Sequence, residues 1–398
     1  MSPTRIASYS QILVYNIDLL AFIRSWFTLL MLMCFMADYY LLFHFKSMLQ
    51  DYKPPSFTSV CDGVVPTKRL ALAHLPTPIE PIRLPNTPED VAVFLKRDDM
   101  TGGIELTGNK VRKLEFILAD ALCSGAQRIF TTGGSQSNHA RATAAACAKL
   151  GLPCELYLRK DPSIGSGNAF LVTLLGATVH EYTREEIKEK QLQAEDGDWV
   201  AEEARRRAKE LSQKVVSIPV GGSNNLGMWG YIQAVDEMSK QVDLSGFSAI
   251  VSASGSGGTI AGLGVGMEMF RRSSPTPAPK VVSYGICDTP DYFHNVVDRL
   301  TVASWKDCPK SKDMIDMRDA AGDGYGKNTS EQLQYLSLVA RQCGVIFDTC
   351  YSGKCLYEFG RDIAKGSYAD QRLLFIHTGG APSTFDKKDR YLLGDPTL

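Results

Sequence analysis

Short apolar runs alternate with amphipathic segments of helical length from about residue 68 onward, and this alternation restricts the fold more than any other feature of the 398-residue chain. The runs are rich in β-branched residues and read as strands, while the segments between them have the spacing of helices. Strands that are apolar on both faces are typical of a parallel sheet covered by helices on both sides. The pattern therefore predicts an α/β fold with right-handed crossovers, built as two lobes.

The expected elements follow from the same pattern. Expected strands span residues 91–95, 128–132, 154–158, 215–219, 249–253, 281–285, 345–348 and 373–377. Expected helices span residues 111–123, 138–150, 185–214, 227–240, 258–270, 329–342 and 354–364. Because ligands of such folds bind at the carboxyl ends of the strands, the residues that follow each strand are the candidates for a functional site.

Charge and cysteine content narrow the class of protein. Lys and Arg number 43 against 44 Asp and Glu, which gives a net charge of -1 and no basic field for nucleic acid. The ten cysteines are scattered, without a C-x-x-C pair or the spacing of metal ligands. We therefore expect reduced thiols, no bound metal and no nucleic-acid partner, and a reducing compartment.

The amino terminus carries an uncharged apolar run over residues 26–37, continued after Asp38 and flanked by Arg24 and Lys46. About twenty residues span a bilayer, but the Asp inside the run would cost roughly 2.5–3.5 kcal/mol. The run is read as a membrane anchor, a secretory segment, a targeting peptide or an extension outside the fold. Residues 51–67 contain Pro-Pro and are expected to be a linker.

The segment Ser252-Ala-Ser-Gly-Ser-Gly-Gly-Thr259 follows an apolar strand and opens a helix. Its glycines let backbone N–H groups converge on an anion at the positive end of the helix, and its hydroxyls add donors. It is neither the dinucleotide fingerprint, since Ile260 stands at the third glycine position, nor a P-loop. The segment predicts a phosphate cradle, with a tight glycine turn as the alternative.

Two further loops combine polar residues with a helix start. In Leu106-Thr-Gly-Asn-Lys-Val-Arg-Lys-Leu-Glu115, Lys110 begins an amphipathic helix, where the helix dipole disfavours a charge and favours a nucleophilic amine. In Thr131-Thr-Gly-Gly-Ser-Gln-Ser-Asn-His139, hydroxyl and N–H groups suit a carboxylate. From the residues alone, a solvated surface lysine and a simple helix cap remain open.

Together these loops resemble the family of D-cysteine desulfhydrases and 1-aminocyclopropane-1-carboxylate (ACC) deaminases, among the fold-type II pyridoxal-phosphate enzymes. The resemblance covers about residues 68–388. It rests on ordered motifs, namely Lys-Arg-Asp-Asp99, Gly-Asn-Lys-Val-Arg-Lys-Leu-Glu115, Gly-Gly-Ser-Gln-Ser-Asn-His139, Ile-Pro-Val-Gly-Gly-Ser223, Ser-Gly-Ser-Gly-Gly-Thr-Ile-Ala-Gly262, Tyr-Ser-Gly-Lys354 and His-Thr-Gly-Gly-Ala-Pro382.

The resemblance implies a tryptophan synthase β-like fold of two open twisted α/β lobes, with pyridoxal 5'-phosphate between them. The implied large lobe comprises residues 68–112 and 219–390, the small lobe residues 113–218, and residues 1–67 form an extension. A homodimer, a small amino-acid substrate and a cytoplasmic or mitochondrial location are implied too. Contact with a membrane is expected only through the amino-terminal segment.

The resemblance also implies residue roles. Lys110 would bind the cofactor covalently, and Asn138 would hydrogen-bond its phenolic oxygen. Ser137 and His139 would lie beside the substrate, Ser137 against its Cα and carboxylate. The implied phosphate cradle consists of Ser254, Gly255, Ser256, Gly257, Gly258 and Thr259. Tyr325 and Tyr351 would stand beside the substrate side chain, and the implied base is Lys110 or a group such as Ser137.

Ser352 and Thr378 favour one activity within the family. Deaminases that resemble this chain carry Glu and Leu there, whereas desulfhydrases carry hydroxyl residues. An acid beside the pyridine nitrogen keeps it protonated, while a hydroxyl favours the neutral ring. Elimination of a thiol tolerates that weaker electron sink, so the pair predicts β-elimination of D-cysteine to pyruvate, hydrogen sulfide and ammonia. ACC deaminase, another lyase such as D-serine ammonia-lyase, and an inactive membrane-anchored binding protein are the alternatives. Cys350 with Thr349 departs from the Asp-Pro-Val that relatives often carry before the tyrosine.

Overall fold

The computed structural model describes residue 26 and residues 48–60, 62–160, 165–302 and 305–393. Apart from Trp26, the apolar stretch 26–37 lies outside these residues, and so does the anchor predicted for it. Within the described ranges, none of the helices combines the length and the apolar character that a bilayer crossing requires. Of the two compact units, residues 1–49 and 50–398, the second holds the two large sheets.

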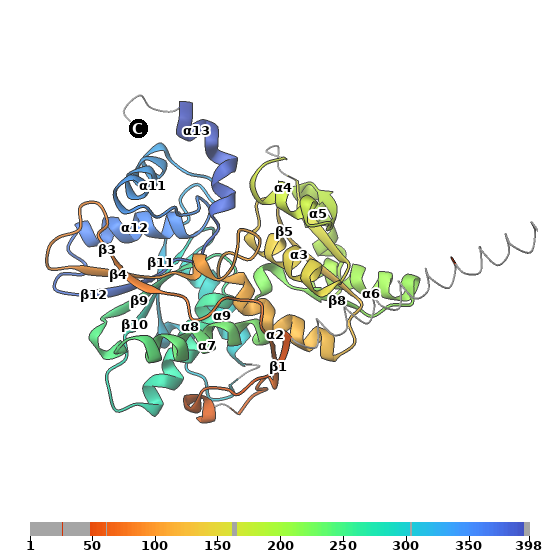
Figure 1. The fold of residues 1–398 in the computed structure, drawn as a ribbon, viewed down its shortest axis with the longest axis horizontal. Helices are drawn as coiled ribbons and strands as arrows, with labels where there is room; N and C mark the ends of the chain where they lie inside the picture. The colour runs from red at the N-terminus through yellow and green to blue at the C-terminus, as the bar shows by residue number, and fades with distance from the viewer. Residues whose placement is uncertain (1–25, 27–47, 61, 161–164, 303–304, 394–398) are drawn as a thin grey trace, which may run out of the picture. The chain divides into compact units, whose positions relative to one another are not determined.

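The larger sheet has six strands (Figure 1). In spatial order they are β11 (Ile315–Asp319), β10 (Lys280–Gly285), β9 (Ala249–Ser254), β12 (Arg372–Ile376), β4 (Ala92–Lys96) and β3 (Ile79–Ile82). All neighbours are parallel except β3, which runs antiparallel to β4. In the centre, Val251 of β9 pairs with Val282 on one side and Phe375 on the other. The predicted parallel sheet is thus present, with an antiparallel edge strand.

Helices cover both faces of this sheet. On one face, α8 (Gly258–Ser273) packs on β9 and β10 and in turn contacts α7 (Asn225–Gln241). On the other face, α12 (Ser352–Ala364) packs on the same two strands and contacts α11 (Ser330–Cys343). Each face has its own apolar core, which explains why the strands read as continuous apolar runs.

The smaller sheet has four parallel strands. In order they are β7 (Thr178–Tyr182), β6 (Cys154–Arg159), β5 (Arg128–Gly134) and β8 (Val215–Ile218). Its helices are α3 (Asn138–Leu150), α4 (Gly167–Leu174), α5 (Arg184–Gln193) and α6 (Trp199–Leu211). The lobe boundary drawn between residues 112 and 113 falls inside α2 (Lys110–Cys123), which contacts both α7 and α3. A continuous helix therefore passes between the two sheets.

The remaining elements are short or peripheral. They are β1 (Leu49–Asp51), β2 (Lys68–Leu70), α9 (Pro290–Val302), α10 (Ser311–Met314), α13 (Lys388–Leu393), and the 3-10 turns η1 (Ser56–Val60), η2 (Asp98–Met100), η3 (Val220–Gly222), η4 (Leu244–Gly246) and η5 (Ala381–Lys387).

The single helix predicted over residues 185–214 is wrong, since the structure has α5 and α6 there. Gly197 lies in the left-handed region, with φ of 68°. Asp198 then caps α6, because its side chain accepts a hydrogen bond from the backbone of Ala201 at 3.0 Å. A left-handed glycine followed by a capping aspartate ends one helix and starts another.

The strand predicted over residues 345–348 is also wrong, because these described residues lie outside every strand. Their backbone is satisfied by side chains instead of a sheet neighbour. The carbonyl of Ile346 is hydrogen-bonded by His377 Nε2 at 3.0 Å. The Asp348 carboxylate accepts from the backbone of Cys350 and Tyr351 and so bends the chain into α12.

The segment expected to be a linker packs onto the large lobe. Phe57 is 6% exposed, belongs to the same core as α7 and α8, and meets the ring of Phe270 edge-on at 5.9 Å. Tyr52 donates a hydrogen bond to Gln233 at 2.9 Å. Pro-Pro therefore directs this segment across the surface of the lobe, and the aromatic residues around it supply the anchoring that the linker prediction overlooked.

Candidate active site

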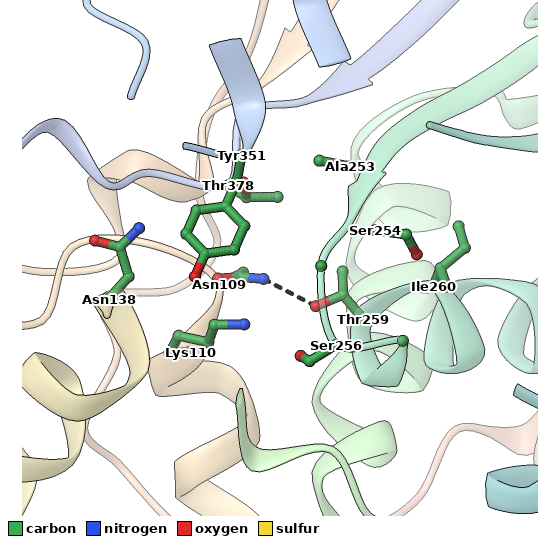
Figure 2. Close-up of a pocket in the computed structure, with 12 residues that line it drawn as sticks. Asn109, Lys110, Asn138, Ala253, Ser254, Ser256, Thr259, Ile260, Tyr351 and Thr378 are labelled. Atoms are coloured by element: carbon green, nitrogen blue, oxygen red, sulfur yellow. Dashed lines mark hydrogen bonds between the residues drawn. The ribbon is translucent and has the colours of Figure 1, made fainter. Parts of the chain in front are cut away.

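The loop between β9 and α8 forms one wall of the pocket in Figure 2. Gly257 occupies the N-cap of α8 with φ of 80° and has no side chain to cap the helix, while Ser223 Oγ accepts a hydrogen bond from the backbone N–H of Gly258 at 3.2 Å. Among the described residues, the buried Ser254 Oγ has no hydrogen-bond partner. A side chain at Gly255 would place its Cβ 2.7 Å from the ring of Tyr351. Open N–H donors at the positive end of a helix and an unpaired hydroxyl suit an anion such as phosphate.

Lys110 begins α2 and points toward this loop (Figure 2). The preceding Asn109 donates from its amide to Thr259 Oγ1 at 2.8 Å, which ties the start of α2 to the start of α8. Burial lowers the pKa of Lys110 to about 8, although the carboxylate of Asp348 raises it. The amine is therefore buried, directed at an anion site, and readily deprotonated, and these properties favour a nucleophile over the surface lysine that remained open from sequence.

The start of α3 supplies polar groups on a second wall. Ser137 caps the helix by accepting from the backbone of Ala140 at 3.2 Å, as the alternative interpretation of this loop predicted. Asn138 accepts from Asn168 at 2.8 Å through its oxygen, which leaves its amide nitrogen for an oxygen atom of a ligand. Capping and ligand contact are compatible here, because Asn138 lines the pocket while Ser137 lines the cleft that leads to it.

His139 is buried behind the same helix start. Its Nε2 lies 2.9 Å from Thr131 Oγ1, and within the described part of the chain its buried Nδ1 has no partner. Burial, reinforced by Lys110 and Lys113, lowers the pKa of His139 well below its usual value. The imidazole is thus neutral at neutral pH and acts as a polar group without charge.

Tyr325 and Tyr351 meet at the opposite side of the cleft. Their hydroxyl oxygens are 2.7 Å apart, and their rings are nearly perpendicular with centroids 5.6 Å apart. Burial raises the pKa of both phenols, so both stay protonated and act as hydrogen-bond donors. Because one hydroxyl must donate to the other, the pair has one proton left for a ligand.

The two hydroxyl residues used to distinguish activities differ in exposure. Thr378 lines the pocket with Lys110. Ser352 is fully buried, and its hydroxyl donates to Asp348. Burial raises the pKa of Asp348, while hydrogen bonds from Ser352 and the backbone of Tyr351 lower it. Ser352 therefore rests on a buried carboxylate, and Thr378 is the member of the pair that faces the pocket.

Most predicted site residues lie together. Those lining the pocket are Lys110, Asn138, Ser254, Gly255, Ser256, Gly257, Thr259, Tyr351 and Thr378. A cleft of about 800 Å³ opens beside it, and Ser137, His139 and Tyr325 line this cleft. Gly258 and Ser352 are behind these walls, since neither lines the pocket or the cleft.

Sequence reasoning missed four residues of the site, namely Asn109, Lys113, Arg159 and Asp348. Lys113 is fully buried and donates to the carbonyl of Gly221 at 3.0 Å, and its Nζ lies 2.8 Å from the place that a Cβ on Gly258 would occupy. The i, i+3 spacing from Lys110 could have placed both amines on one face of α2. The position of Arg159, in contrast, depends on the pairing of β6 with β5, which no local pattern specifies.

The chain is similar in sequence to known pyridoxal-phosphate dependent enzymes. A family model described as pyridoxal-phosphate dependent enzyme matches residues 70–379. The chain is 40% identical over 355 residues to an Arabidopsis thaliana protein named bifunctional D-cysteine desulfhydrase/1-aminocyclopropane-1-carboxylate deaminase, mitochondrial, covering 86% of this chain and 85% of the relative. It is 35% identical to the D-cysteine desulfhydrase of Klebsiella pneumoniae, covering 80% of this chain and 95% of the relative.

Solved structures agree with these matches. A crystal structure of an ACC deaminase homologue is similar with a TM-score of 0.72 and 31% identity, covering 86% of this chain and 99% of that chain. The cysteine synthase of Entamoeba histolytica shares the fold, with a TM-score of 0.56 and 15% identity over 80% of this chain and 89% of that chain. The predicted two-lobed α/β fold class is confirmed.

Proposed function

The chain belongs to the family of pyridoxal-phosphate dependent enzymes, in the branch of D-cysteine desulfhydrases and ACC deaminases, and from this membership we propose that it converts D-cysteine and water to pyruvate, hydrogen sulfide and ammonia. The observation that carries the proposal is a hydroxyl pair, Ser352 and Thr378, at the two positions where deaminases that resemble this chain carry Glu and Leu. Elimination from D-cysteine releases a good leaving group and therefore needs less electron withdrawal by the cofactor than ring opening does.

Pyridoxal phosphate is the cofactor of this family, and the residues present fit it. The Ser254 hydroxyl, which has no hydrogen-bond partner among the described residues, and the backbone N–H groups of the glycine loop before α8 suit its phosphate. The amine of Lys110 suits its aldehyde, and the amide nitrogen of Asn138 suits its phenolic oxygen. When bound, the cofactor supplies an electron sink for charge that develops at the substrate Cα.

The side chains of this chain bind the substrate and move its protons. Ser137 and the N–H groups at the start of α3 suit the substrate carboxylate. Lys110, whose pKa is lowered to about 8 by burial, is the proposed base for the Cα proton, with Ser137 as the alternative. Tyr325 and Tyr351 keep their protons because burial raises their pKa, and the free one of the two suits the departing sulfur.

ACC deaminase is the second candidate function. The Arabidopsis relative is named for both activities, and a Thermotoga maritima relative that is 36% identical over 81% of this chain and 99% of its own length is named a putative ACC deaminase. Both names are compatible with the pocket, because the same lysine, cradle and tyrosine pair would serve ring opening. The discriminating residues remain Ser352 and Thr378.

The test compares two products on purified holoenzyme. We expect sulfide and pyruvate from D-cysteine, less turnover of L-cysteine and D-serine, and little 2-oxobutanoate from ACC. Ser352→Glu with Thr378→Leu should lower D-cysteine turnover, while Ser352→Thr should preserve it as the matched hydroxyl control. Faster release of 2-oxobutanoate than of sulfide by the wild-type protein would reverse the proposal.

We also propose a homodimer and a cytoplasmic or mitochondrial location. The Arabidopsis relative is named as a mitochondrial protein, which supports the mitochondrial location for this chain. Imaging of full-length protein with a carboxyl-terminal fluorescent tag, beside a variant that lacks residues 1–49, tests the address. Light scattering of purified protein tests the dimer.

A further inference from the structure

Arg159 lines the active-site cleft and forms no ion pair with any acidic residue that the structure describes. It is the last residue of β6, opposite Gly134 of β5 in the parallel register, and it lines the cleft together with Lys110 and Ser137. Within the described residues, its one recorded contact is with the face of the Tyr325 ring, 5.3 Å from guanidinium carbon to ring centroid. The side chain is half-buried, so it loses hydration without gaining an ion pair.

Two other arginines of the same lobe, unlike Arg159, form ion pairs with glutamates. Arg128 donates to Glu155 at 2.9 Å on the same sheet. Arg206 donates to Glu203 on the surface of α6 at 2.8 Å. Arg159 is different because it lines the cleft and pairs with none of the carboxylates in the described ranges. A half-buried guanidinium in a ligand cleft is suited to pair with an anionic group of the ligand.

Gly134 lets the backbone of β5 lie close to Tyr325 and Arg159, because it has no side chain. A Cβ placed on Gly134 would lie 3.3 Å from Tyr325 Cε1, 3.6 Å from the Tyr325 hydroxyl oxygen and 3.8 Å from the Arg159 Nη2 atom. One small region therefore touches a glycine backbone, a phenol hydroxyl and a guanidinium nitrogen. Only a few atoms fit there, and a negative charge is favoured.

We propose that Arg159 and Tyr325 form a leaving-group subsite, which accepts an anionic group on the substrate Cβ and stabilises the negative charge that develops there. The proposal rests on the proposed function, because it assigns the substrate's α-carboxylate to the start of α3 and leaves Arg159 for the side chain. In D-cysteine, the Cβ–S bond breaks and both electrons go to sulfur. The sulfur departs as HS⁻ beside Arg159, which remains a cation, and then takes a proton from solvent.

The cleft offers an internal control for simple charge attraction. Arg184 lines the same cleft and carries the same charge, but it begins α5 and has no recorded contact with either tyrosine. Arg184→Gln and Arg159→Gln remove the same charge from the cleft, so attraction of any anion to the cleft is reduced in both. Only Arg159→Gln alters the region beside Gly134 and Tyr325.

The first test measures binding of two ligands of equal shape and different charge. D-aspartate and D-asparagine are titrated into holoenzyme, and binding is followed by the visible absorbance of the cofactor. The wild-type protein and Arg184→Gln should bind D-aspartate about tenfold to a hundredfold more tightly than D-asparagine, the range expected for a charge-assisted hydrogen bond. Arg159→Gln should lose that preference, and Arg159→Lys should keep part of it.

A wild-type protein that does not prefer D-aspartate, or a preference that survives in Arg159→Gln, overturns the subsite. This result is independent of the proposed function, since neither ligand needs to react. Failure of the wild-type protein to release sulfide from D-cysteine contradicts the proposed function alone.

The second test varies the leaving group. Chloride departs from β-chloro-D-alanine as a weak base and needs little stabilisation, whereas HS⁻ from D-cysteine needs more. Arg159→Gln should lower kcat/KM for D-cysteine about tenfold more than kcat/KM for β-chloro-D-alanine, a modest share of what one preorganised donor contributes in a closed site. An equal loss for both substrates, with Arg184→Gln unchanged in their ratio, would show that Arg159 has only a structural role.

Discussion

Two groups of buried charges lie on opposite sides of α2, and they differ in whether the protein completes them. On one side, Arg112 is held between Asp98 and Glu237, and Lys96 donates to Glu237 at 2.5 Å. On the other side, Lys110 lines the cleft and Lys113 lies behind it, where it donates to the carbonyl of Gly221. Among the described residues, neither amine has a carboxylate in hydrogen-bond contact. We call Arg112, Lys96, Asp98 and Glu237 the paired cluster, because their charges are balanced within the fold. We call Lys110 and Lys113 the open cluster, because their charges need an anionic ligand.

The pKa shifts follow this difference. In the paired cluster, burial would raise the pKa of Glu237, but hydrogen bonds from Arg112 and attraction to Lys96 lower it to about 2. In the open cluster, burial lowers the pKa of Lys110 to about 8 and that of Lys113 well below its usual value. Lys96 is the exception, because burial lowers its pKa even beside Glu237. The carboxylate of Glu237 thus keeps its charge, and the buried amines of Lys110 and Lys113 lose their protons more readily than an ordinary lysine does.

The strongest test of the comparison is Lys110→Ala. We expect loss of turnover and of the visible cofactor absorbance, because the amine that holds the cofactor is gone. The melting temperature of the apoprotein should stay the same or rise, since an unpaired buried amine is removed. Lys149→Ala, which removes an exposed lysine 3.7 Å from Glu105, is the control and should keep full activity.

Turnover by Lys110→Ala above a small residual rate would contradict the assignment of the open cluster. A large fall in the melting temperature of its apoprotein would instead place Lys110 among the structural charges.

The sequence predicted the open cluster better than the paired one. Lys110 and the loop from Ser254 to Thr259 could be identified because each follows a strong local signal, a helix start or a glycine-rich turn after a strand. Arg112 stands in the same motif as Lys110, yet its partner Glu237 lies 125 residues away in α7. A long-range ion pair leaves no local pattern, so its existence depends on the packing of the two helices.

The same reasoning explains which strands were predicted. β5, β6 and β9 are interior strands of their sheets, each with a run of buried residues, and their starts were predicted correctly. β3 and β11 lie at the edges of the large sheet, where burial alternates and the apolar signal is weak, and the sequence pattern did not reveal them. Residues 345–348 are apolar for a different reason, because Val345 and Phe347 pack in the core without joining the sheet.

Breaking the paired cluster should have the next largest effect. Arg112→Met keeps the volume but leaves Asp98 and Glu237 as buried acids with fewer partners. We expect the free energy of unfolding to fall by about 3–5 kcal/mol, the usual cost of removing one partner of a buried pair. Urea denaturation monitored by circular dichroism measures this change.

Lys240→Met on the same helix as Glu237 is the matched control, since it breaks an exposed ion pair with Asp236 at 2.6 Å. Such pairs contribute about 0–1 kcal/mol. If Arg112→Met and Lys240→Met lowered the free energy of unfolding equally, the ion pairs of the paired cluster would contribute no more to stability than an exposed pair.

A smaller effect is expected for Lys113→Met. The variant retains the buried volume but removes an amine that supports the phosphate cradle from behind, since Lys113 donates to the carbonyl of Gly221 and lies beside Gly258. The dissociation constant of pyridoxal phosphate should rise by up to about tenfold, as loss of one hydrogen bond that positions the cradle predicts. Titration of apoprotein followed by visible absorbance measures it, and an unchanged constant would remove Lys113 from the phosphate site.

The smallest effect concerns the pH dependence of cofactor loading, and it isolates the open cluster without any mutation. The amine of Lys110 attacks an aldehyde only in its neutral form, and its pKa is lowered to about 8. The neutral fraction therefore rises as pH increases through this value, and loading of apoprotein should accelerate about tenfold between pH 7 and pH 9 and then level off. An amine with the usual lysine pKa would show no plateau over that range, so stopped-flow absorbance at a series of pH values distinguishes the two cases. A rate that keeps rising beyond pH 9 would mean that the pKa of Lys110 is higher than its burial indicates. The amine would then keep its proton at neutral pH even though no carboxylate contacts it.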